Sequence, residues 1–196
     1  MQPDNTLNQI FEKLVQELDK KKIKFSIAGA FAVSLYAGPR ATSDIDLVTF
    51  LDKGSREKVV SILDKNFKLL QSNQKTIPMR FYEIWRNIVK IENTSSIIVP
   101  IDFIIVPNDY LPGVLNRSVI LRIDNSDIRF LSKEDLILMK LDSTRAKDID
   151  DIERIIKGPE GIDYDYINSW AKKYSLHTEI LDKFRKDIKM DFGPEL

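Results

Sequence analysis

The sequence predicts a mixed α/β (α+β) fold, in which helices flank a mixed β-sheet and a helical portion follows. Helical periodicity alternates with short apolar strand patterns in the first part of the chain, and residues 67–105 are rich in β-branched and aromatic side chains. After Leu131 only helical patterns remain. We therefore expect an α/β core over residues 1–131 and a C-terminal helical portion over residues 132–196, with no internal repeat.

The N-terminal elements are predicted from apolar spacing and from one clear stop signal. Apolar residues recur at spacings of three and four before Lys20, as on one face of a helix. A short apolar helix starts at Gly29 and ends at Gly38-Pro39, because Gly accepts a left-handed cap and Pro cannot continue a helix. In chain order, the predicted elements are a helix over residues 5–20, a strand over 24–28, the short helix, a strand over 45–50 and a helix over 55–66.

The remaining elements change from strands to helices near Leu131. The clearest strand patterns are "MRFYEIWR" and "IIVPIDFIIV", which combine aromatic and β-branched residues. Ser132, followed by Asp135, resembles a capping box with an acid in place of the usual Glu or Gln, and it predicts a helix start. In chain order, strands are predicted over 79–86, 97–106, 119–123 and 128–131, and helices over 132–141, 145–157, 164–173 and 178–189.

The composition is that of a chain with a sizeable core and no membrane span. Of the 196 residues, 43% are hydrophobic and 31% are charged, which is ordinary for a globular domain. No apolar run reaches the roughly 18 residues that a membrane helix needs, and the N-terminus lacks the build of a secretory signal. Because cysteine is absent, disulfides and thiolate metal sites are excluded, and a cytoplasmic protein without a membrane partner is expected.

The charge balance and the histidine content argue against further classes of partner and of catalytic site. The 30 basic and 30 acidic residues cancel, so no whole-molecule field that gathers nucleic acid is evident. The single histidine, His177, lies in a polar helical tail, which argues against histidine-based acid–base catalysis and histidine-rich metal sites. Carboxylates and basic side chains are therefore the groups to consider first.

One of three Asp-x-Asp pairs has both carboxylates on one face of a predicted strand. Asp44 and Asp46 lie in an apolar strand, where alternate residues share a face. The pair at 148 and 150 lies on a helix, where residues two apart point in nearly opposite directions. The pair at 163 and 165 lies beside a glycine in a predicted turn, where local capping explains it. Only the first pair therefore predicts shared chemistry.

Asp44 and Asp46 predict a site for a hard divalent cation. In a partly buried cleft, two such carboxylates require that one pKa rises or that a cation lies between them. Mg²⁺ prefers one or two carboxylates with substrate phosphates, and a third acid would complete a site for two Mg²⁺ ions, or for Mn²⁺ in their place. Asp102 is that third acid, because it interrupts an apolar strand where a lone buried charge is costly. The alternative for Asp102 is an acid at a strand edge, in water.

The turn at Gly29-Ala30 predicts a phosphate site next to these acids. It precedes a helix, whose first backbone N–H groups and dipole suit an anion, and glycine lets the backbone approach closely. A plain strand-to-helix turn is the alternative. The sequence matches neither the G-x-x-x-x-G-K-[ST] loop nor the G-x-G-x-x-G dinucleotide motif.

The order of these parts resembles the polymerase-β-like nucleotidyltransferase superfamily. The stretches "IAGAFAVSLYAGPRATSDIDLV" and "LSKEDLILMKLDSTRAKDIDDIERI" are most similar to its minimal bacterial branch, which includes the AbiEii-type nucleotidyltransferase toxins. The resemblance covers residues 27–156. It implies a nucleotidyltransferase-type mixed sheet in the core and a catalytic centre of aspartates.

By this resemblance, the site residues divide by role. Asp44, Asp46 and Asp102 would bind the metals, and Asp102 would also help to activate the acceptor hydroxyl. Lys140 would be catalytic by neutralising phosphate charge, and Asp148 and Asp151, one helical turn apart, would orient Lys140 or contact the nucleotide. The residues that would bind the nucleotide are Gly29, Ala30, Arg40, Thr42, Ser43, Asp148 and Asp151.

Three of these assignments have structural alternatives, and one position departs from the family pattern. The sequence at Lys140 is equally typical of a lysine that extends from an amphipathic helix into water. Asp148 and Asp151 are equally typical of a solvated helix face. Arg40 would either reach phosphate or fix its loop. Many relatives carry Gly or Ser where this chain has Ala30, so a hydroxyl contact to phosphate is lost while the backbone N–H remains.

The predicted function is Mg²⁺-dependent transfer of a nucleoside monophosphate from an NTP to a hydroxyl, with release of pyrophosphate. RNA, a protein side chain and a small molecule such as an aminoglycoside stay open as acceptors. The branch implies the toxin of a toxin–antitoxin pair, with an antitoxin protein as partner. A non-catalytic relative that binds a nucleotide or partner is the first alternative, and a structural interaction domain that uses the helical tail is the second.

Overall fold

Sixteen helices and strands make up the described part of the chain. The computed structural model describes residues 5–49, 51–91, 97–123, 126–143, 145–159 and 161–192. In chain order the elements are α1 (Asn5–Lys20), β1 (Phe25–Ile27), α2 (Gly29–Ala37), β2 (Ile45–Thr49), α3 (Lys53–Asn66), β3 (Lys68–Ser72), β4 (Ile77–Pro78), β5 (Glu83–Lys90), β6 (Val99–Ile105), α4 (Leu111–Arg117), β7 (Val119–Ile123), β8 (Ser126–Phe130), α5 (Lys133–Leu141), α6 (Ala146–Ile156), α7 (Tyr164–Lys173) and α8 (Glu179–Phe192).

The strands form one mixed sheet, as the sequence predicts. Within the described residues the sheet has eight strands in the order β3-β5-β6-β2-β1-β8-β7, and the short β4 pairs with β5. The two central strands, β2 and β6, run parallel, and β5 is antiparallel to β6. In this register Asp46 lies opposite Asp102, and Asp102 lies opposite Arg86. Three charged residues therefore stand in one row across three neighbouring strands.

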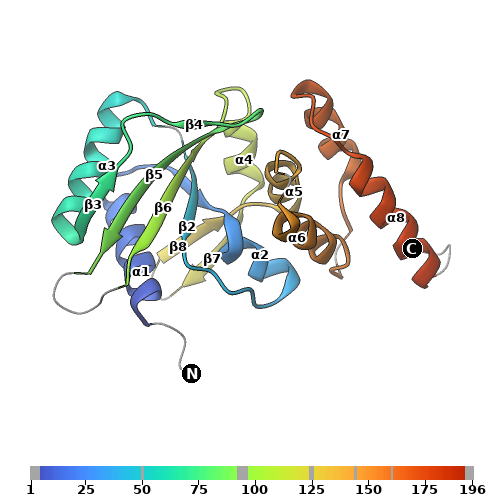
Figure 1. Cartoon of the computed structure of the whole chain (residues 1–196), viewed down its shortest axis with the longest axis horizontal. Coiled ribbons are helices and arrows are strands. Elements are labelled where there is room, and N and C mark those ends of the chain that lie inside the picture. Colours follow the sequence, from blue (N-terminus) through green and yellow to red (C-terminus); the bar gives the residue numbers. More distant parts are fainter. Residues whose placement is uncertain are drawn as a thin grey trace.

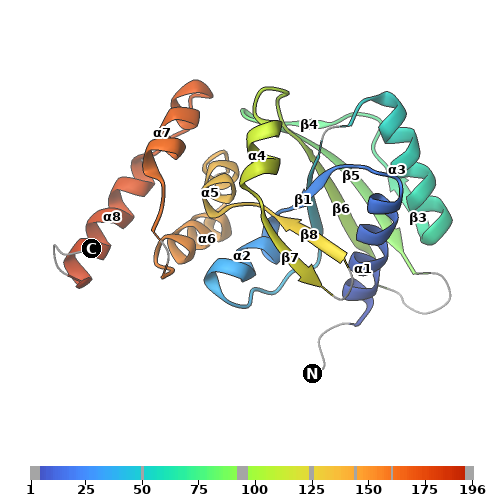
Figure 2. The ribbon, with the colours of Figure 1, turned by 180° about the vertical axis from the view of Figure 1, so that it is seen from behind.

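The apolar face of the sheet explains why these strands form where they do. Ile45 and Leu47 alternate with the aspartates of β2 and are fully buried, as period-two alternation predicts. Trp85 of β5 faces the same side, where Arg56 of α3 lies over its ring. Figure 2 shows α1 and α3 over this face of the sheet. Burial of each such Ile or Leu side chain contributes about 1.5–3 kcal/mol to stability.

The helices divide the molecule into a sheet end and a helical end. Figure 1 shows α2, α5 and α6 beside one end of the sheet, with α7 and α8 farther out and α3 at the opposite end. Contacts join α2 to both α5 and α6, so these helices pack directly on the sheet-bearing part. The domain division after residue 131 stays a prediction. Among the described helices, none has both the length and the apolarity to span a bilayer.

A buried carboxylate joins α5 to its neighbours. Asp135 is fully buried and accepts hydrogen bonds from the hydroxyls of Tyr110, at 2.5 Å, and Tyr166, at 2.8 Å. Ser132 caps α5 by accepting a hydrogen bond from the backbone N–H of Asp135, as its position in the sequence predicts. The Arg117 guanidinium lies 3.4 Å from the same carboxylate and stacks on the Tyr166 ring. This network connects α4, α5 and α7.

The structure differs from the sequence predictions at one strand boundary and in three elements, β3, β4 and α4, that were not predicted. The strand predicted over 79–86 begins at Glu83, because residues 79–82 form the turn between β4 and β5, closed by a hydrogen bond from Met79 N to Tyr82 O. Helix α4 was not predicted, since Pro112 and Gly113 interrupt its pattern; Pro is accepted here because it lies in the first turn. Position 50, the predicted end of the second strand, lies outside the described residues.

Candidate active site

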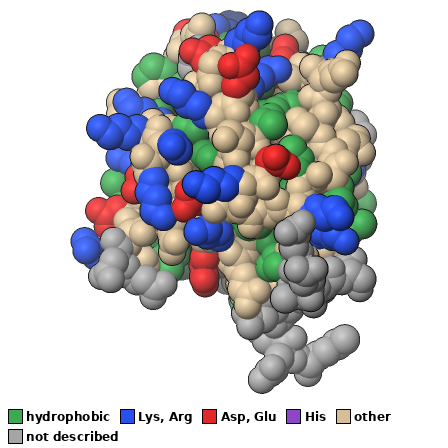
Figure 3. Space-filling model, turned by 90° about the vertical axis from the view of Figure 1, so that its left-hand side faces the viewer, with side chains coloured by type: hydrophobic (Ala, Val, Ile, Leu, Met, Phe, Trp, Pro, Cys, Tyr) green, Lys and Arg blue, Asp and Glu red, His purple; other side chains and the backbone are tan. Residues whose placement is uncertain are grey.

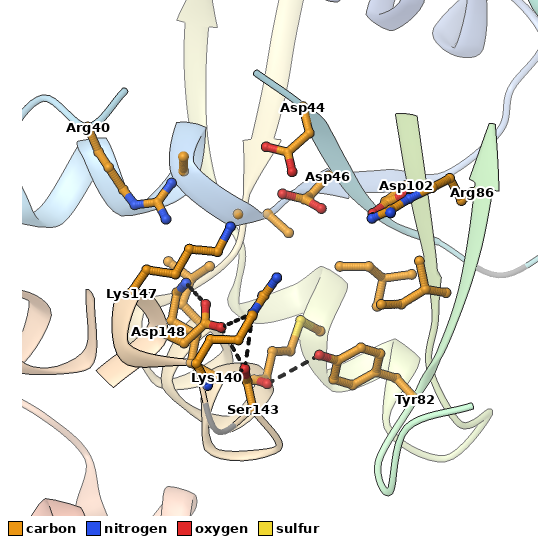
Figure 4. Close-up of a pocket in the computed structure, with 18 residues that line it drawn as sticks. Arg40, Asp44, Asp46, Tyr82, Arg86, Asp102, Lys140, Ser143, Lys147 and Asp148 are labelled. Carbon is orange, nitrogen blue, oxygen red and sulfur yellow. Dashed lines mark hydrogen bonds and ion pairs between the residues drawn. The ribbon is translucent and has the colours of Figure 1, made fainter. Parts of the chain in front are cut away.

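Two walls of charged side chains face each other across one pocket. Figure 4 shows the three aspartates with Arg86 on one wall, and side chains of α5, α6 and their connection on the other. The pocket is lined by Ala28, Gly29, Ala30, Arg40, Asp44, Asp46, Tyr82, Ile84, Arg86, Asp102, Ile104, Leu136, Met139, Lys140, Ser143, Arg145, Lys147 and Asp148. The structure thus brings the predicted Asp44, Asp46, Asp102 and Lys140 into one pocket.

The parallel pairing of β2 and β6 brings the carboxylates of the site close together. Asp46 and Asp102 are cross-strand neighbours, and Asp44, directly before β2, lines the same pocket. Thr42 does not line the pocket, but its hydroxyl donates a 2.6 Å hydrogen bond to Asp44 Oδ1 and so orients that carboxylate. Ser43, also predicted to bind the nucleotide, is exposed and lies outside the pocket lining.

Gly29 is placed so that Asp46 fits against the start of α2. Its φ is +55°, in the left-handed region, and a Cβ built there would lie 1.8 Å from Asp46 Oδ2. The backbone N–H of the preceding Ala28 donates to the Asp46 carbonyl at 2.9 Å, which fixes the strand against the helix start. Glycine at position 29 therefore lets a carboxylate, and not only a phosphate, approach the backbone.

The environment of Asp46 disfavours its charged form. Burial, followed by the neighbouring charges of Asp44 and Asp102, raises the pKa of Asp46 from 3.8 to about 7. Lys140 and Arg145 across the pocket oppose this rise. A divalent cation beside these carboxylates would remove the repulsion, which makes Asp44 and Asp46 a chemically suitable pair for one.

The third carboxylate is directed toward an arginine instead of the other two acids. Arg86 Nε and a terminal nitrogen of the same guanidinium donate to the two Asp102 oxygens at 2.8 and 2.6 Å. Within the described residues, no group of three or more acidic, histidine or cysteine side chains is arranged to hold a metal ion. The residues present therefore fit a cation at Asp44 and Asp46, while Asp102 is paired elsewhere.

On the opposite wall, Lys140 is buried between two carboxylates. It donates to Asp148 Oδ1 at 3.0 Å and to Asp151 Oδ2 at 2.6 Å, and both aspartates are buried. The structural alternatives considered from the sequence, a lysine extended into water and a solvated acidic helix face, therefore do not hold for Lys140, Asp148 and Asp151. Asp151 does not line the pocket itself; it reaches the pocket only through Lys140 and Arg40.

Asp148 is ionised by its partners despite burial. Burial alone would raise its pKa, but hydrogen bonds from the Ser143 hydroxyl and Lys140, with Arg145, hold the pKa below its usual value. Ser143 and Arg145 each donate to Asp148 Oδ2 at 2.6 Å. This cluster keeps the ammonium of Lys140 and the Arg145 guanidinium at the pocket wall.

Two arginines join α6 to the loop that precedes β2. Arg154 donates to the carbonyls of Ala37, Gly38 and Pro39 at 2.7, 3.3 and 3.4 Å. Arg40 Nε lies 2.7 Å from Asp151 Oδ1 as an ion pair. Arg40 thus both fixes its loop and lines the pocket.

No role was predicted from the sequence for five polar pocket residues, namely Tyr82, Arg86, Ser143, Arg145 and Lys147. Arg145 and Lys147 lie within the "RAKDID" stretch that was noted for its aspartates, just before Asp148, and that position was a usable signal. Tyr82 and Arg86 come from the β4–β5 hairpin and reach the site only through strand pairing. No local pattern identifies those two.

Solved structures of several proteins share this fold at low sequence identity. ANT(2")-Ia, in complex with adenylyl-2"-tobramycin, aligns with a TM-score of 0.53 at 12% identity, covering 85% of this chain and 95% of that one. JHP933 from Helicobacter pylori aligns at 0.55 and 17% identity, covering 97% and 83%. An antigenic nucleotidyltransferase-like protein from Paracoccidioides brasiliensis aligns at 0.55 and 16% identity, covering 96% and 89%.

The fold is therefore that of the nucleotidyltransferases, and the predicted fold class is confirmed. The family described as "Nucleotidyltransferase of unknown function (DUF6036)" matches residues 5–192, nearly the whole chain, and the chain belongs to that family. No curated protein matches the chain in sequence. The chain is a nucleotidyltransferase, and its resemblance to the polymerase-β-like superfamily is confirmed. The AbiEii-type toxin branch stays a prediction.

Proposed function

We propose that this nucleotidyltransferase transfers a nucleoside monophosphate from an NTP to a hydroxyl with the help of Mg²⁺. The observation that carries this proposal is the cross-strand pairing of Asp46 with Asp102, beside Asp44 and next to the start of α2. In this reaction the acceptor oxygen forms a bond to the α-phosphorus, the bond to the bridging oxygen breaks, and pyrophosphate leaves. The hydroxyl proton passes to a carboxylate oxygen of Asp102.

Asp44 and Asp46 would hold the divalent ion, with Asp102 as a third ligand, and Mn²⁺ would substitute for Mg²⁺. When bound, such an ion supplies positive charge to the phosphate oxygens and lowers the cost of charge development there. The raised pKa of Asp46 supports this assignment, because burial and the charges of Asp44 and Asp102 disfavour its ionised form and a cation would offset both.

The remaining pocket residues would bind and orient the triphosphate. The backbone N–H groups at Gly29 and Ala30 begin α2 and suit an anion at the helix start. Lys140, held by Asp148 and Asp151, and Arg145 face the carboxylates across the pocket and would neutralise phosphate charge. We assign Thr42 to the support of Asp44, and the nucleotide-binding role of Ser43, which lies outside the pocket lining, stays a prediction from the sequence.

The acceptor is a hydroxyl of RNA, protein or a small molecule. ANT(2")-Ia, which shares the fold, is solved with an adenylylated antibiotic, so a small-molecule acceptor has a structural precedent. A toxin role with an antitoxin partner, and a cytosolic location, stay predictions from the sequence. No contact in the described residues favours the non-catalytic alternative over catalysis.

Ligand-dependent stabilisation tests the proposal directly. The melting temperature should rise when Mg²⁺ and the preferred NTP are added together, relative to EDTA, because a ligand that binds the folded state stabilises it by mass action. Asp46→Asn should abolish that rise. Asp127→Asn, which removes an exposed carboxylate of β8, is the matched control and should keep it. Equal rises in wild type and Asp46→Asn would contradict the proposal.

The acceptor is then found by transfer of label. The protein is incubated with α-labelled NTPs, Mg²⁺ and cell extract, and the RNA, protein and small-molecule fractions are separated. Label should enter one fraction with the wild-type protein and none with Asp46→Asn. Label that enters a fraction equally with both proteins would not come from this site.

A further inference from the structure

Asp102 stands between a basic and an acidic neighbour in the row that crosses the sheet. On one side, Arg86 of β5 is its antiparallel neighbour; on the other, Asp46 of β2 is its parallel neighbour. In the structure both Asp102 oxygens accept hydrogen bonds from the Arg86 guanidinium, at 2.8 and 2.6 Å. A cation shared with Asp46 would have to bind the same carboxylate from the opposite side.

The ion pair between Arg86 and Asp102 is of a strong type, against which a metal ion would have to compete for the carboxylate. A guanidinium that donates two parallel hydrogen bonds to a carboxylate forms one of the stronger ion pairs in proteins. Asp102 is buried, with 5% of its side chain exposed, so water screens the pair weakly. A divalent cation placed next to Asp102 would also be repelled by the guanidinium charge. Arg86 and a metal ion at Asp102 therefore oppose each other.

The two partners differ in their freedom to move. Asp102 lies in a central strand with neighbours on both sides, whereas 41% of the Arg86 side chain is exposed at the pocket. A long arginine side chain at a pocket rim can change rotamer without a change in the sheet. A triphosphate in the pocket would offer Arg86 another anion with the same two-pronged geometry.

We propose that Arg86 is a positioning residue that keeps Asp102 from binding metal until a nucleotide enters the pocket. The proposal rests on the function proposed above for the three aspartates. In the nucleotide-free protein, one divalent ion binds at Asp44 and Asp46. The phosphates of the NTP then draw Arg86 away, Asp102 becomes available, and the second ion binds with the nucleotide. The complete metal site is thereby assembled only on a loaded enzyme.

Metal stoichiometry tests this without any measurement of activity. Mn²⁺ is titrated into nucleotide-free protein and bound ions are counted by electron paramagnetic resonance and calorimetry. Wild type should bind one ion tightly, and Arg86→Met should bind a second ion at least about tenfold more tightly than wild type does, the size of an ordinary coupling between two sites. With a non-hydrolysable NTP analogue, both proteins should bind two ions.

Matched variants separate the contact from the charge. Lys147→Met removes a positive charge from the same pocket, but from α6, and should leave the stoichiometry of wild type. Arg86→Lys keeps the charge and loses the two-pronged geometry, so its second ion should bind with intermediate affinity. If Arg86→Met fails to fold, as judged by circular dichroism, the wild-type and Arg86→Lys titrations still decide.

The outcomes distinguish this inference from the function on which it rests. Two tight ions on nucleotide-free wild type, or the same second-ion affinity in wild type, Arg86→Met and Arg86→Lys, would overturn the role of Arg86 while leaving the metal site intact. No Mn²⁺ binding by wild type in the presence of the nucleotide analogue would overturn the metal site itself.

Discussion

Gly29 is the residue at which backbone and carboxylate come closest. Its left-handed φ and the 1.8 Å gap between a built Cβ and Asp46 Oδ2 impose separate requirements for glycine. Gly38 has a positive φ as well, but a Cβ there would meet nothing within 4 Å. Substitution of Gly38 therefore tests backbone strain alone. Substitution of Gly29 tests backbone strain together with the displacement of Asp46.

Gly29→Ala should lose both stability and ligand binding. The unfavourable φ should cost about 1–3 kcal/mol in either Gly29→Ala or Gly38→Ala, measured by urea unfolding. Only Gly29→Ala should also lose the rise in melting temperature with Mg²⁺ and NTP, because the methyl group displaces Asp46. A Gly29→Ala protein that responds to ligand like Gly38→Ala would show that Asp46 adjusts without loss of binding.

Asp46 should make stability depend on pH in the absence of metal. Its pKa of about 7 in the folded state lies above the 3.8 of the unfolded chain, so the folded state holds a proton that the unfolded state has released between these values. The resulting stabilisation is complete below about pH 4 and is lost as pH rises through about 7, a change on the order of 4 kcal/mol.

Urea unfolding in EDTA at about pH 5 and about pH 8 measures this effect. Between these conditions Asp46→Asn should lose less stability than wild type, and it should be the more stable protein at the higher pH. Asp127→Asn, which alters an exposed carboxylate, should retain the wild-type dependence. Parallel curves for wild type and Asp46→Asn would show that Asp46 titrates normally.

At the scale of the residue, the apolar pattern of the strands predicted the three aspartates of the site but not the basic side chains that pair with them. Asp44 and Asp46 stand out because two charges share one face of an apolar strand, and Asp102 because it interrupts another. Arg86 carries no such signal, since an arginine in an alternating strand is ordinary. Its role depends on the register between β5 and β6, which is set by the whole sheet and not by the local sequence.

At the scale of the element, the register of β2 and β6 is the feature on which the site depends. A shift of one residue would turn Asp102 to the apolar face and bring Phe103 to the pocket. The sequence predicted both strands, because their apolar residues are buried as the patterns require. It could not predict that they pair in parallel, since the connection between them contains a helix and further strands.

The Asp135 network should contribute strongly to the attachment of α4 and α7 to α5. Asp135→Ala would leave the hydroxyls of Tyr110 and Tyr166 and the Arg117 guanidinium without this partner, at a cost of about 3–5 kcal/mol. Tyr166→Phe removes a single hydrogen bond and should cost about 1 kcal/mol. Urea unfolding measures both, with Glu153→Ala, which removes a partly exposed carboxylate of α6, as control. Equal losses in both variants would contradict a shared network.

At the scale of the whole molecule, a net charge of zero conceals an uneven distribution. Figure 3 shows many Lys and Arg side chains on the side of the molecule that carries α3 and β3. Residues 53–72 of that side contain Lys53, Arg56, Lys58, Lys65 and Lys68 but only two acids. A net charge of zero therefore describes the average of the surface and does not exclude an anionic partner on this face.

The pocket itself is lined by more basic than acidic side chains. We expect this excess of positive charge to determine which acceptors the enzyme prefers. Its cations are Arg40, Arg86, Lys140, Arg145 and Lys147, and its carboxylates are Asp44, Asp46, Asp102 and Asp148. Two Mg²⁺ ions and an NTP of charge about −4 would nearly cancel each other, and Asp148 already pairs with Lys140 and Arg145. No lining carboxylate is left to receive a polycation.

We expect neutral or anionic hydroxyl acceptors to be preferred over polycationic aminoglycosides. Transfer from α-labelled NTP to a panel of RNA ends, nucleosides, neutral sugars and aminoglycosides measures the preference as kcat/KM. The aminoglycosides should be poorer by on the order of tenfold or more, since unpaired like charges oppose binding. An aminoglycoside that ranks first in this panel would contradict the expectation.

The contacts of Arg154 and Arg40 determine which parts of the pocket move together. Because α6 is bonded to the carbonyls that end α2 and paired with the loop leading to β2, these three segments form one mechanical unit. We expect the spacing between the aspartates and Lys140 to change little during turnover. Tyr82 and Arg86 come from the β4–β5 hairpin, outside that unit, so we expect the movements that admit substrate and release pyrophosphate to involve these two side chains.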